Sequence, residues 1–292
     1  MRSGFVALAG RPNVGKSTLL NAVVGDKVAI VSERPQTTRR AIRGIATTEE
    51  AQLVMVDLPG VQRPRDLLTD RMQRRMQREL ADADAVLFML AGDQSIGPGD
   101  RYIARAVAAS GLPSAVAVNK ADLLSRQKTL EALEAAADFG LDGEVFPVSA
   151  RTGVGVEPLV RALSELVPEG PMLYPPDERS DMSERVRLAE LVREQVLRRM
   201  REELPHAVEV EVDEIEERED GLLVVRARLW AESESQKGIL IGARGAMVRE
   251  IGTAARKEIE RRSGRHVHLD LSVQVRKGWR RDESMLDRLG IE

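Results

Sequence analysis

Cysteine is absent from this chain of 292 residues, and only three residues are histidine. Without cysteine there is no disulfide framework, no cysteine-ligated zinc or iron–sulfur cluster and no thiol nucleophile. So few histidines also argue against a histidine-rich metal site. The longest apolar run, residues 85–91, falls far short of the roughly 18 residues that a membrane-spanning helix needs. The amino terminus runs into a glycine-containing loop instead of a cleavage site, so we expect it to be the first strand of a cytoplasmic protein.

The charges of the chain nearly cancel, but they are unevenly distributed. Lys and Arg number 44 and Asp and Glu 47, a formal net charge of -3, which argues against a wholly basic nucleic-acid coat protein. Residues 236–281 nevertheless contain 12 basic and 4 acidic side chains, whereas residues 201–235 contain 4 and 12. A strongly basic segment therefore follows a strongly acidic one near the end of the chain.

The length predicts two domains, at roughly 100 to 200 residues each. In the first part, short apolar runs alternate with amphipathic stretches, which is typical of helices that cover a mostly parallel sheet. Strands are predicted at residues 5–9, 40–46, 52–57, 85–90, 115–119 and 144–147, and helices near residues 16–24, 69–81, 100–109, 128–139 and 156–166. Too few residues separate the second strand from the third for a crossover helix, so this edge pair should be antiparallel.

Four prolines at positions 168, 171, 175 and 176 mark a stretch that can hold neither a helix nor a central strand. We interpret residues 168–180 as a linker between a first domain, residues 1–167, and a second domain, residues 181–292, which ends in a basic tail. The apolar pattern of the second domain predicts the order helix, strand, strand, helix, helix, strand.

Residues 10–17 match the phosphate-binding pattern G-x-x-x-x-G-K-[ST] between a predicted strand and a predicted helix. The two glycines allow backbone N–H groups to surround phosphates at the positive end of the helix. Lys16 would neutralise the β- and γ-phosphate oxygens, and Ser17 would coordinate Mg2+. The predicted phosphate-binding residues are Gly10, Arg11, Pro12, Asn13, Val14, Gly15, Lys16, Ser17 and Thr18.

A second short motif, Asp-Leu-Pro-Gly at residues 57–60, follows the third predicted strand. The Asp57 carboxylate can hold Mg2+ through water, and the Gly60 N–H can meet the γ-phosphate. Taken alone, the motif fits an ordinary turn equally well. Its place at a strand end after the phosphate-binding loop favours the functional reading.

Two later motifs can distinguish guanine from adenine. Asp122, in Asn-Lys-Ala-Asp, can accept from N1–H and from the 2-amino group of guanine, whereas adenine has an acceptor and no amine there. Asn119 can hydrogen-bond the other edge, and the aliphatic stem of Lys120 can cover the ring. Ser149 and Ala150 can supply a backbone N–H to the guanine carbonyl. Four motifs occur in this order: the phosphate loop, Asp-Leu-Pro-Gly, Asn-Lys-Ala-Asp and Ser-Ala. Because each lies at the carboxyl end of a predicted strand, together they predict a guanine-nucleotide site in an open α/β sheet.

With these motifs, residues 1 to about 165 resemble a Ras-like GTPase domain of the translation-factor class. The resemblance implies that a threonine between the first helix and the second strand closes on Mg2+ and the γ-phosphate. Thr37 and Thr38 both lie there, and the position next to Arg39 favours Thr38. The predicted metal ligands are thus Ser17, Thr38 and Asp57, and the predicted catalytic groups are Asn13, Lys16, Thr38 and Gly60.

One position departs from the pattern of many such GTPases. They place a glutamine after the Asp-x-x-Gly glycine to orient the attacking water, but this chain has Val61, which cannot do so. We therefore expect slow intrinsic hydrolysis. The resemblance to GTPases with an apolar residue there implies K+ as a substitute, with Asn13 as its ligand. The alternative is that Asn13 only favours a turn.

The second domain contains a Gly-x-x-Gly loop at residues 242–245, the loop by which KH modules clamp a nucleic-acid backbone. The loop joins two predicted helices after two strands and before a third, the order of a type II KH fold. Ile239 and Ile241 can wall a groove for bases or belong to the core, and Trp279 can stack on a base or pack within its domain. The predicted RNA-binding residues are Lys237, Ile239, Ile241, Gly242, Ala243, Arg244, Gly245, Arg249, Lys277 and Trp279.

In combination, these motifs make the whole chain similar to the bacterial Era family. The implied fold is α/β: a Ras-like P-loop NTPase domain, with a mostly parallel sheet and an antiparallel edge strand, followed by a smaller α+β type II KH domain. The resemblance implies a monomeric, Mg2+-dependent GTPase that binds small-subunit ribosomal RNA near its 3′ end. It further implies action in assembly of the small ribosomal subunit and a peripheral location at the inner face of the cell membrane. Two alternatives remain: a second domain that docks protein or lipid, and a P-loop phosphotransferase that acts on a small molecule.

Overall fold

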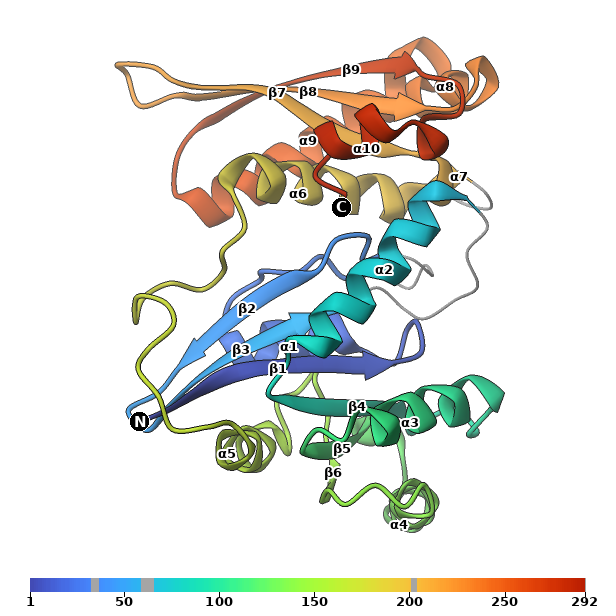
Figure 1. Cartoon of the computed structure of the whole chain (residues 1–292). Helices are drawn as coiled ribbons and strands as arrows, with labels where there is room; N and C mark the ends of the chain where they lie inside the picture. The colour runs from blue at the N-terminus through green and yellow to red at the C-terminus, as the bar shows by residue number, and fades with distance from the viewer. Residues whose placement is uncertain (33–36, 59–65, 201–203, 292) are drawn as a thin grey trace. The chain divides into compact units, whose positions relative to one another are not determined.

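A computed structural model describes residues 1–32, 37–58, 66–200 and 204–291 (Figure 1). The chain divides into two compact units, Met1–Arg65 with Thr69–Asp181, and Asp66–Leu68 with Met182–Glu292. Within the described ranges, no helix is both long enough and apolar enough to cross a membrane.

The first unit is built on a six-stranded sheet in the order β2-β3-β1-β4-β5-β6. Neighbouring strands are parallel except β2 and β3, which pair antiparallel. The predicted edge hairpin is therefore present, because the short turn between these two strands leaves no room for a crossover. The strands are β1 (Arg2–Gly10), β2 (Ile42–Thr47), β3 (Ala51–Asp57), β4 (Ala85–Ala91), β5 (Ser114–Asn119) and β6 (Val145–Pro147).

Helices cover the sheet of the first unit (Figure 1). They are α1 (Lys16–Val24), α2 (Leu67–Ala81), α3 (Pro98–Ser110), α4 (Arg126–Ala137) and α5 (Val156–Leu166), and a 3-10 turn, η1, spans Ala121–Leu123. Helices α1 and α5 contact each other and share β1 and β3, whereas α3 packs on β1 and β4, and α4 packs on β5 and β6. Every residue of β3 and β4 is buried, as expected for inner strands of a sheet that is covered on both faces.

The pairing of the strands brings three predicted site residues to one edge of this sheet. Asp57 ends β3 opposite Leu8 of β1, and Gly10 ends β1. Asn119 ends β5 opposite Ala91 of β4. Parallel strands bind ligands outside their carboxyl ends. The sheet therefore places the phosphate loop and the later motifs on the same side.

The proline-rich segment after α5 is hydrogen-bonded to the first unit. The Gln52 side chain is completely buried, and its Oε1 accepts from the backbone N–H groups of Leu173 at 2.7 Å and Tyr174 at 2.9 Å. Farther along, the Ile45 N–H of edge strand β2 donates to the Arg179 carbonyl at 2.9 Å. These contacts explain why the first compact unit extends to Asp181.

The second unit has a three-stranded sheet in the order β7-β8-β9, in which β7 and β8 are antiparallel and β8 and β9 parallel. The parallel pair needs a crossover, which helices α8 and α9 provide. Helices α6 and α9 contact each other, and they cover β7 and β9, respectively. The elements are α6 (Glu184–Arg199), α7 (Leu204–Ala207), β7 (Glu209–Glu217), β8 (Leu223–Ala231), α8 (Glu234–Ile241), η2 (Ala243–Gly245), α9 (Ala246–Ser263) and β9 (Val267–Val275). The predicted order of this domain is thus present, with a short added helix, α7.

The carboxyl-terminal segment, predicted as a basic tail, is a folded part of the second unit. After β9 the chain forms a 3-10 turn, η3 (Trp279–Arg281), and a helix, α10 (Glu283–Arg288). Met285 and Leu286 of α10 are fully buried. The Arg288 guanidinium lies 5.6 Å from the centre of the Trp230 ring and forms an ion pair with Glu211 at 2.8 Å. Burial of these apolar side chains, which sequence patterning had not singled out, fixes the carboxyl-terminal segment.

Candidate functional site

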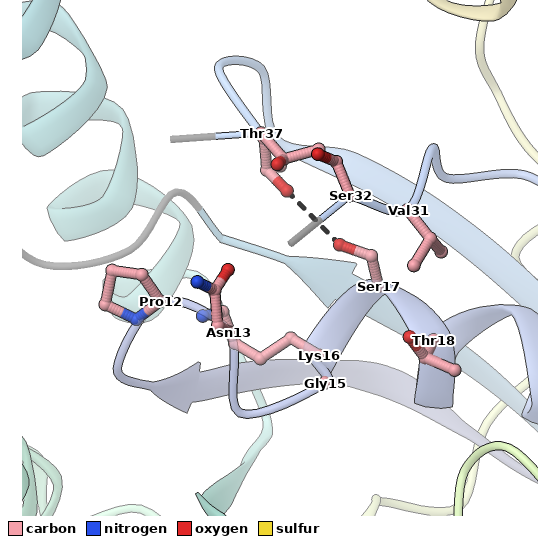
Figure 2. A pocket seen from close by; sticks show the side chains of 10 residues that line it. Pro12, Asn13, Gly15, Lys16, Ser17, Thr18, Val31, Ser32 and Thr37 are labelled. Carbon is pink, nitrogen blue, oxygen red and sulfur yellow. Dashed lines mark hydrogen bonds between the residues drawn. The ribbon is translucent and has the colours of Figure 1, made fainter. Parts of the chain in front are cut away.

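A pocket opens where β1 meets α1 (Figure 2). Two conformations with positive φ shape the loop, 65° at Asn13 and 100° at Gly15. A Cβ atom on Gly15 would lie 2.2 Å from Nδ2 of Asn119, and one on Gly10 would lie 2.6 Å from the Met89 carbonyl oxygen, so both positions require glycine. The pocket is lined by Pro12, Asn13, Gly15, Lys16, Ser17, Thr18, Val31, Ser32, Thr37 and Thr38.

The Lys16 ammonium is buried at the floor of this loop. Its Nζ donates to the carbonyl oxygens of Gly10 and Arg11, each at 3.0 Å. Burial lowers the pKa of Lys16, and the negative charge of Asp57 partly opposes this effect. A buried cation beside backbone N–H groups at the start of a helix is an arrangement that favours a bound anion such as a phosphate.

Arg11 and Val14 belong to the loop but do not line the pocket. The Arg11 Nε pairs with the fully buried Asp100 carboxylate of α3 at 2.7 Å. Val14 is itself fully buried. In the predicted phosphate-binding set, these two residues therefore have side chains that hold the loop in place and do not line the pocket.

Three side-chain oxygens gather beside the loop. Ser17 Oγ donates to Asp57 Oδ2 at 2.5 Å, and Thr38 Oγ1 donates to the same oxygen at 3.2 Å. The two hydroxyl oxygens are 3.2 Å apart. The structure thus brings Thr38 to the carboxylate that the sequence predicted, and Thr37 lines the same pocket. Gly60 and Val61 lie outside the described residues.

These oxygens suit a hard divalent cation. Burial raises the pKa of the Asp57 carboxyl, while the Lys16 charge and the hydrogen bonds from Ser17 and Thr38 act in the opposite direction. The other carboxylate oxygen, Asp57 Oδ1, is buried and has no hydrogen-bond partner among the described residues. Mg2+ binds through oxygen ligands of this type, usually one or two carboxylates together with substrate phosphates. The donor set therefore fits Mg2+.

Asn119 connects two loops and is almost completely buried. Its Nδ2 donates to the Val14 carbonyl at 2.8 Å, and its Oδ1 accepts from the Ala150 N–H at 3.0 Å. The sequence had predicted that this amide meets guanine and that the backbone at Ser149 and Ala150 supplies an N–H to the guanine carbonyl. In the structure, the Asn119 amide and the Ala150 N–H are already bonded to each other, so Asn119 holds the phosphate loop against the Ser149 loop.

The other residues predicted to recognise guanine, Lys120 and Asp122, lie directly after β5. Lys120 has φ of 66°, and its Nζ pairs with Asp93 at 3.0 Å. Asp122 receives hydrogen bonds from Ser149 Oγ and from the Arg151 guanidinium, each at 2.6 Å. The Ser149 hydrogen bond lowers the pKa of Asp122, burial opposes it, and the Arg151 charge lowers it further. These interactions keep the Asp122 carboxyl ionised. In that form it can accept hydrogen bonds from both the N1–H and the 2-amino group of guanine.

In the second unit, the Gly-x-x-Gly loop separates α8 from α9. Arg244 in this loop has φ of 52°, and the flanking Gly242 and Gly245 have φ of 71° and 76°. Arg249 donates to the Arg244 carbonyl at 2.8 Å and to the Gly245 carbonyl at 3.1 Å, so its guanidinium closes the loop. Ile239 on α8 is half exposed, which excludes the core alternative for this side chain.

A groove of about 420 Å³ runs between α9 and the edge strand β9. Of its lining residues, the predicted RNA-binding set contains only Arg249, although Arg256 belongs to the basic segment that the sequence had marked for phosphate binding. The alternating pattern of β9 and the three- and four-residue spacing along α9 were the available signals for the others. The groove is lined by Val248, Arg249, Gly252, Thr253, Arg256, Val267, His268, Leu269 and Leu271.

Trp279 is not available to a base. Its side chain is completely buried, and its indole N–H donates to the Ala207 carbonyl at 3.1 Å. The prediction that it stacks on RNA is therefore wrong, and Trp279 is a core residue of the second unit. Lys277, two residues earlier, is exposed, as the prediction requires.

Comparison with known proteins gives the same division of the chain. A family model described as 50S ribosome-binding GTPase matches residues 5–120, and a KH domain model matches residues 203–280. GTPase Era of Mycobacterium tuberculosis strain H37Rv is 47% identical over 295 residues, which cover 99% of this chain and 98% of that protein. The chain belongs to the Era GTPase family. It is therefore a GTP hydrolase, and the predicted family is confirmed.

Two solved Era structures extend this similarity to the fold. A variant of Era from Aquifex aeolicus, bound to GDP and AlF4−, is 34% identical, with a TM-score of 0.95 over 100% of this chain and 99% of that one. Era in complex with MgGDPNP and nucleotides 1506–1542 of 16S ribosomal RNA matches equally well, with the same identity, coverage and TM-score. The predicted fold class is confirmed for this Era-family GTPase: a P-loop GTPase domain followed by a small α+β KH domain.

Proposed function

We propose that this Era-family GTPase is a regulatory switch that binds small-subunit ribosomal RNA near its 3′ end and acts in small ribosomal subunit assembly. The observation that carries the proposal is the full-length similarity to Era in complex with MgGDPNP and nucleotides 1506–1542 of 16S ribosomal RNA. We assign residues 1–167 to the GTPase domain, 168–180 to the linker and 181–292 to the RNA-binding KH domain.

Phosphate binding is assigned to the backbone N–H groups of residues 10–18 and to Lys16. The buried ammonium of Lys16, now bonded to two carbonyl oxygens, is placed to exchange them for phosphate oxygens. Ser17, Thr38 and Asp57 are the proposed holders of Mg2+, which supplies electrostatic stabilisation of phosphate charge when bound. Gly60 keeps its proposed contact with the γ-phosphate.

Guanine selection is assigned to the strand-end motifs. Asp122 accepts from the base, and the Lys120 stem covers the ring. The bonds of Asn119 to Val14 and Ala150 support an organising role for the amide, which sets the distance between the phosphate loop and the base-binding loop. Ser149 orients the Asp122 carboxylate.

We further propose that K+ assists hydrolysis through Asn13. Val61 offers no water-orienting amide, and the left-handed backbone at Asn13, with φ of 65°, is consistent both with a turn and with a carbonyl-type ligand at the loop. Hydrolysis rates in KCl and NaCl at equal ionic strength decide whether Asn13 binds K+ or only forms a turn. Equal rates, or a K+ effect that survives Asn13→Ala, would contradict the proposal.

RNA binding is assigned to the Gly-x-x-Gly loop and the groove between α9 and β9. The groove combines apolar walls with the exposed Arg256 and His268, which suits unstacked bases next to a phosphate backbone. The basic segment around the loop supplies the charge for phosphate contacts, although Arg261 and Arg262 are paired with Glu258. Lys237, Ile239, Ile241, Ala243, Arg244 and Lys277 complete the proposed interface.

A double substitution, Ala243→Asp with Arg244→Asp, tests this interface. It places two carboxylates at the loop, so binding of an RNA with the sequence of the 16S 3′ end should fall at least tenfold, because like charges repel the phosphates. GTP hydrolysis in the absence of RNA should be retained. Arg218→Asp, at the exposed turn between β7 and β8, serves as the control. Undiminished RNA binding by the double variant would instead favour a domain that docks protein or lipid.

We also propose that the nucleotide state changes RNA affinity. Coupling of this kind requires different RNA affinities in the two states. RNA affinities measured with GDP and with a non-hydrolysable GTP analogue should therefore differ, and equal affinities would contradict the switch. Finally, we propose that the protein is monomeric and cytoplasmic and contacts the inner face of the membrane peripherally. Sedimentation of the pure protein, with and without lipid vesicles, tests both parts.

A further inference from the structure

The Asp122 carboxylate is held by a different group on each oxygen. Ser149 Oγ donates to Oδ1 at 2.6 Å, and one terminal nitrogen of Arg151 donates to Oδ2 at 2.6 Å. The direction of the serine hydroxyl is fixed, because Ser149 Oγ also accepts the Thr152 N–H at 3.2 Å. The orientation of the carboxylate plane is therefore set from two sides.

This arrangement leaves room for a base. An ionised carboxylate offers about four lone-pair positions, two on each oxygen. Ser149 and Arg151 each use one position, on different oxygens. The Asp122 backbone N–H also helps to lower the pKa of the carboxyl, but without standard hydrogen-bond geometry, so a position remains on Oδ1 and one on Oδ2. Guanine presents two adjacent donors, N1–H and the 2-amino group, which match two free positions on neighbouring oxygens.

The backbone of the loop that carries Arg151 is hydrogen-bonded on both sides of this residue. The Ser149 N–H donates to the Val154 carbonyl at 2.8 Å, and the Gly153 N–H donates to the Ser149 carbonyl at 2.8 Å. The Ala150 N–H is bonded to Asn119. The backbone on both sides of Arg151 is thus closed on itself, and the guanidinium reaches Asp122 from a fixed origin even though its own side chain is 73% exposed.

We propose that Arg151 is a positioning residue for guanine recognition: by holding Oδ2 of Asp122, it aims one carboxylate oxygen at the 2-amino group of the base. The inference rests on the proposed role of Asp122 as the guanine acceptor. Arg151 acts through Asp122, and its planar fork suits this task better than the point charge of a lysine.

Nucleotides with and without the 2-amino group test this role. Affinities for GDP and IDP are measured by calorimetry on the full chain for the wild type, Arg151→Ala and Arg151→Lys. The control is Arg161→Ala, because Arg161 on α5 is equally exposed, at 71%, and also makes one ion pair, with Glu157. Arg151→Ala should lower the ratio of GDP to IDP affinity about fivefold, near the upper end expected for an exposed ion pair. Arg151→Lys should recover part of the ratio, and Arg161→Ala should leave it unchanged.

The outcomes separate Arg151 from simpler explanations. If Arg151 only stacked on the base or stabilised the loop, Arg151→Ala would weaken GDP and IDP by the same factor, and the inference would be overturned. An unchanged ratio with unchanged affinities would overturn it as well. If the proposed role of Asp122 as the guanine acceptor were itself wrong, the wild type would bind ADP as tightly as GDP. That result is distinguishable from every outcome for the Arg151 variants.

Discussion

Trp279→Phe distinguishes a core tryptophan from one that meets RNA. Phenylalanine keeps an aromatic face that can stack, but it loses the indole N–H that donates to the Ala207 carbonyl at 3.1 Å. Leaving that buried carbonyl without a partner costs about 1–2 kcal/mol. The smaller ring leaves a void of about 40 Å³, which costs about 1 kcal/mol at roughly 24 cal/mol per Å³. The second unit should therefore lose about 2–3 kcal/mol of unfolding free energy.

The chain itself provides the probe for this measurement. It contains two tryptophans, and the other, Trp230, is 6% exposed and lies in the same unit. Its fluorescence in Trp279→Phe reports unfolding of this unit in urea, where an m-value of about 1–1.5 kcal/mol per M converts the loss into a midpoint shift of about 2 M. At low urea, RNA affinity should equal that of the wild type. An unshifted midpoint together with weakened RNA binding would refute the buried assignment.

Two further predictions concern ion pairs. Asp93→Ala releases the Lys120 ammonium from its 3.0 Å partner, so GDP and GTP affinities, measured by calorimetry, should both fall about two- to fivefold; a change for only one nucleotide would contradict a base-covering role for Lys120. Hydrogen bonds from Arg276, the largest cause, and from Ser284 and the Met285 N–H lower the pKa of Asp282 from 3.8 to about 2. Its charged form therefore stabilises the fold above about pH 4, and this contribution is lost as the pH falls towards 2. Asp282→Asn should lower the urea midpoint at pH 6, with a difference from the wild type that shrinks below about pH 4, and a pH-independent difference would contradict the assignment.

The nucleotide site could be predicted from the sequence to the extent that local rules determine it. Asp57 and Asn119 each end a strand whose residues are almost all buried, and parallel strands end at one edge of a sheet. The glycine pattern of the phosphate loop is likewise a local backbone requirement, since Gly15 has φ of 100°. What the sequence could not reveal is how the motifs contact one another. The bonds of the Asn119 amide to Val14 and Ala150 depend on the tertiary structure, as does the contact between Arg151 and Asp122.

The second unit shows more clearly why local patterns fail. Trp279 stands in a run of basic residues, which locally resembles an exposed nucleic-acid contact. Its hydrogen-bond partner Ala207 is 72 residues away, so no local window contains the reason for its burial. The groove residues His268 and Leu269 give no distinguishing signal in the sequence. A parallel strand at the edge of a sheet shows the same alternation of buried and exposed residues as any half-buried strand. A sequence therefore identifies the Gly-x-x-Gly loop, whereas the strand that faces the following helix, α9, across a groove is known only once the sheet order is known.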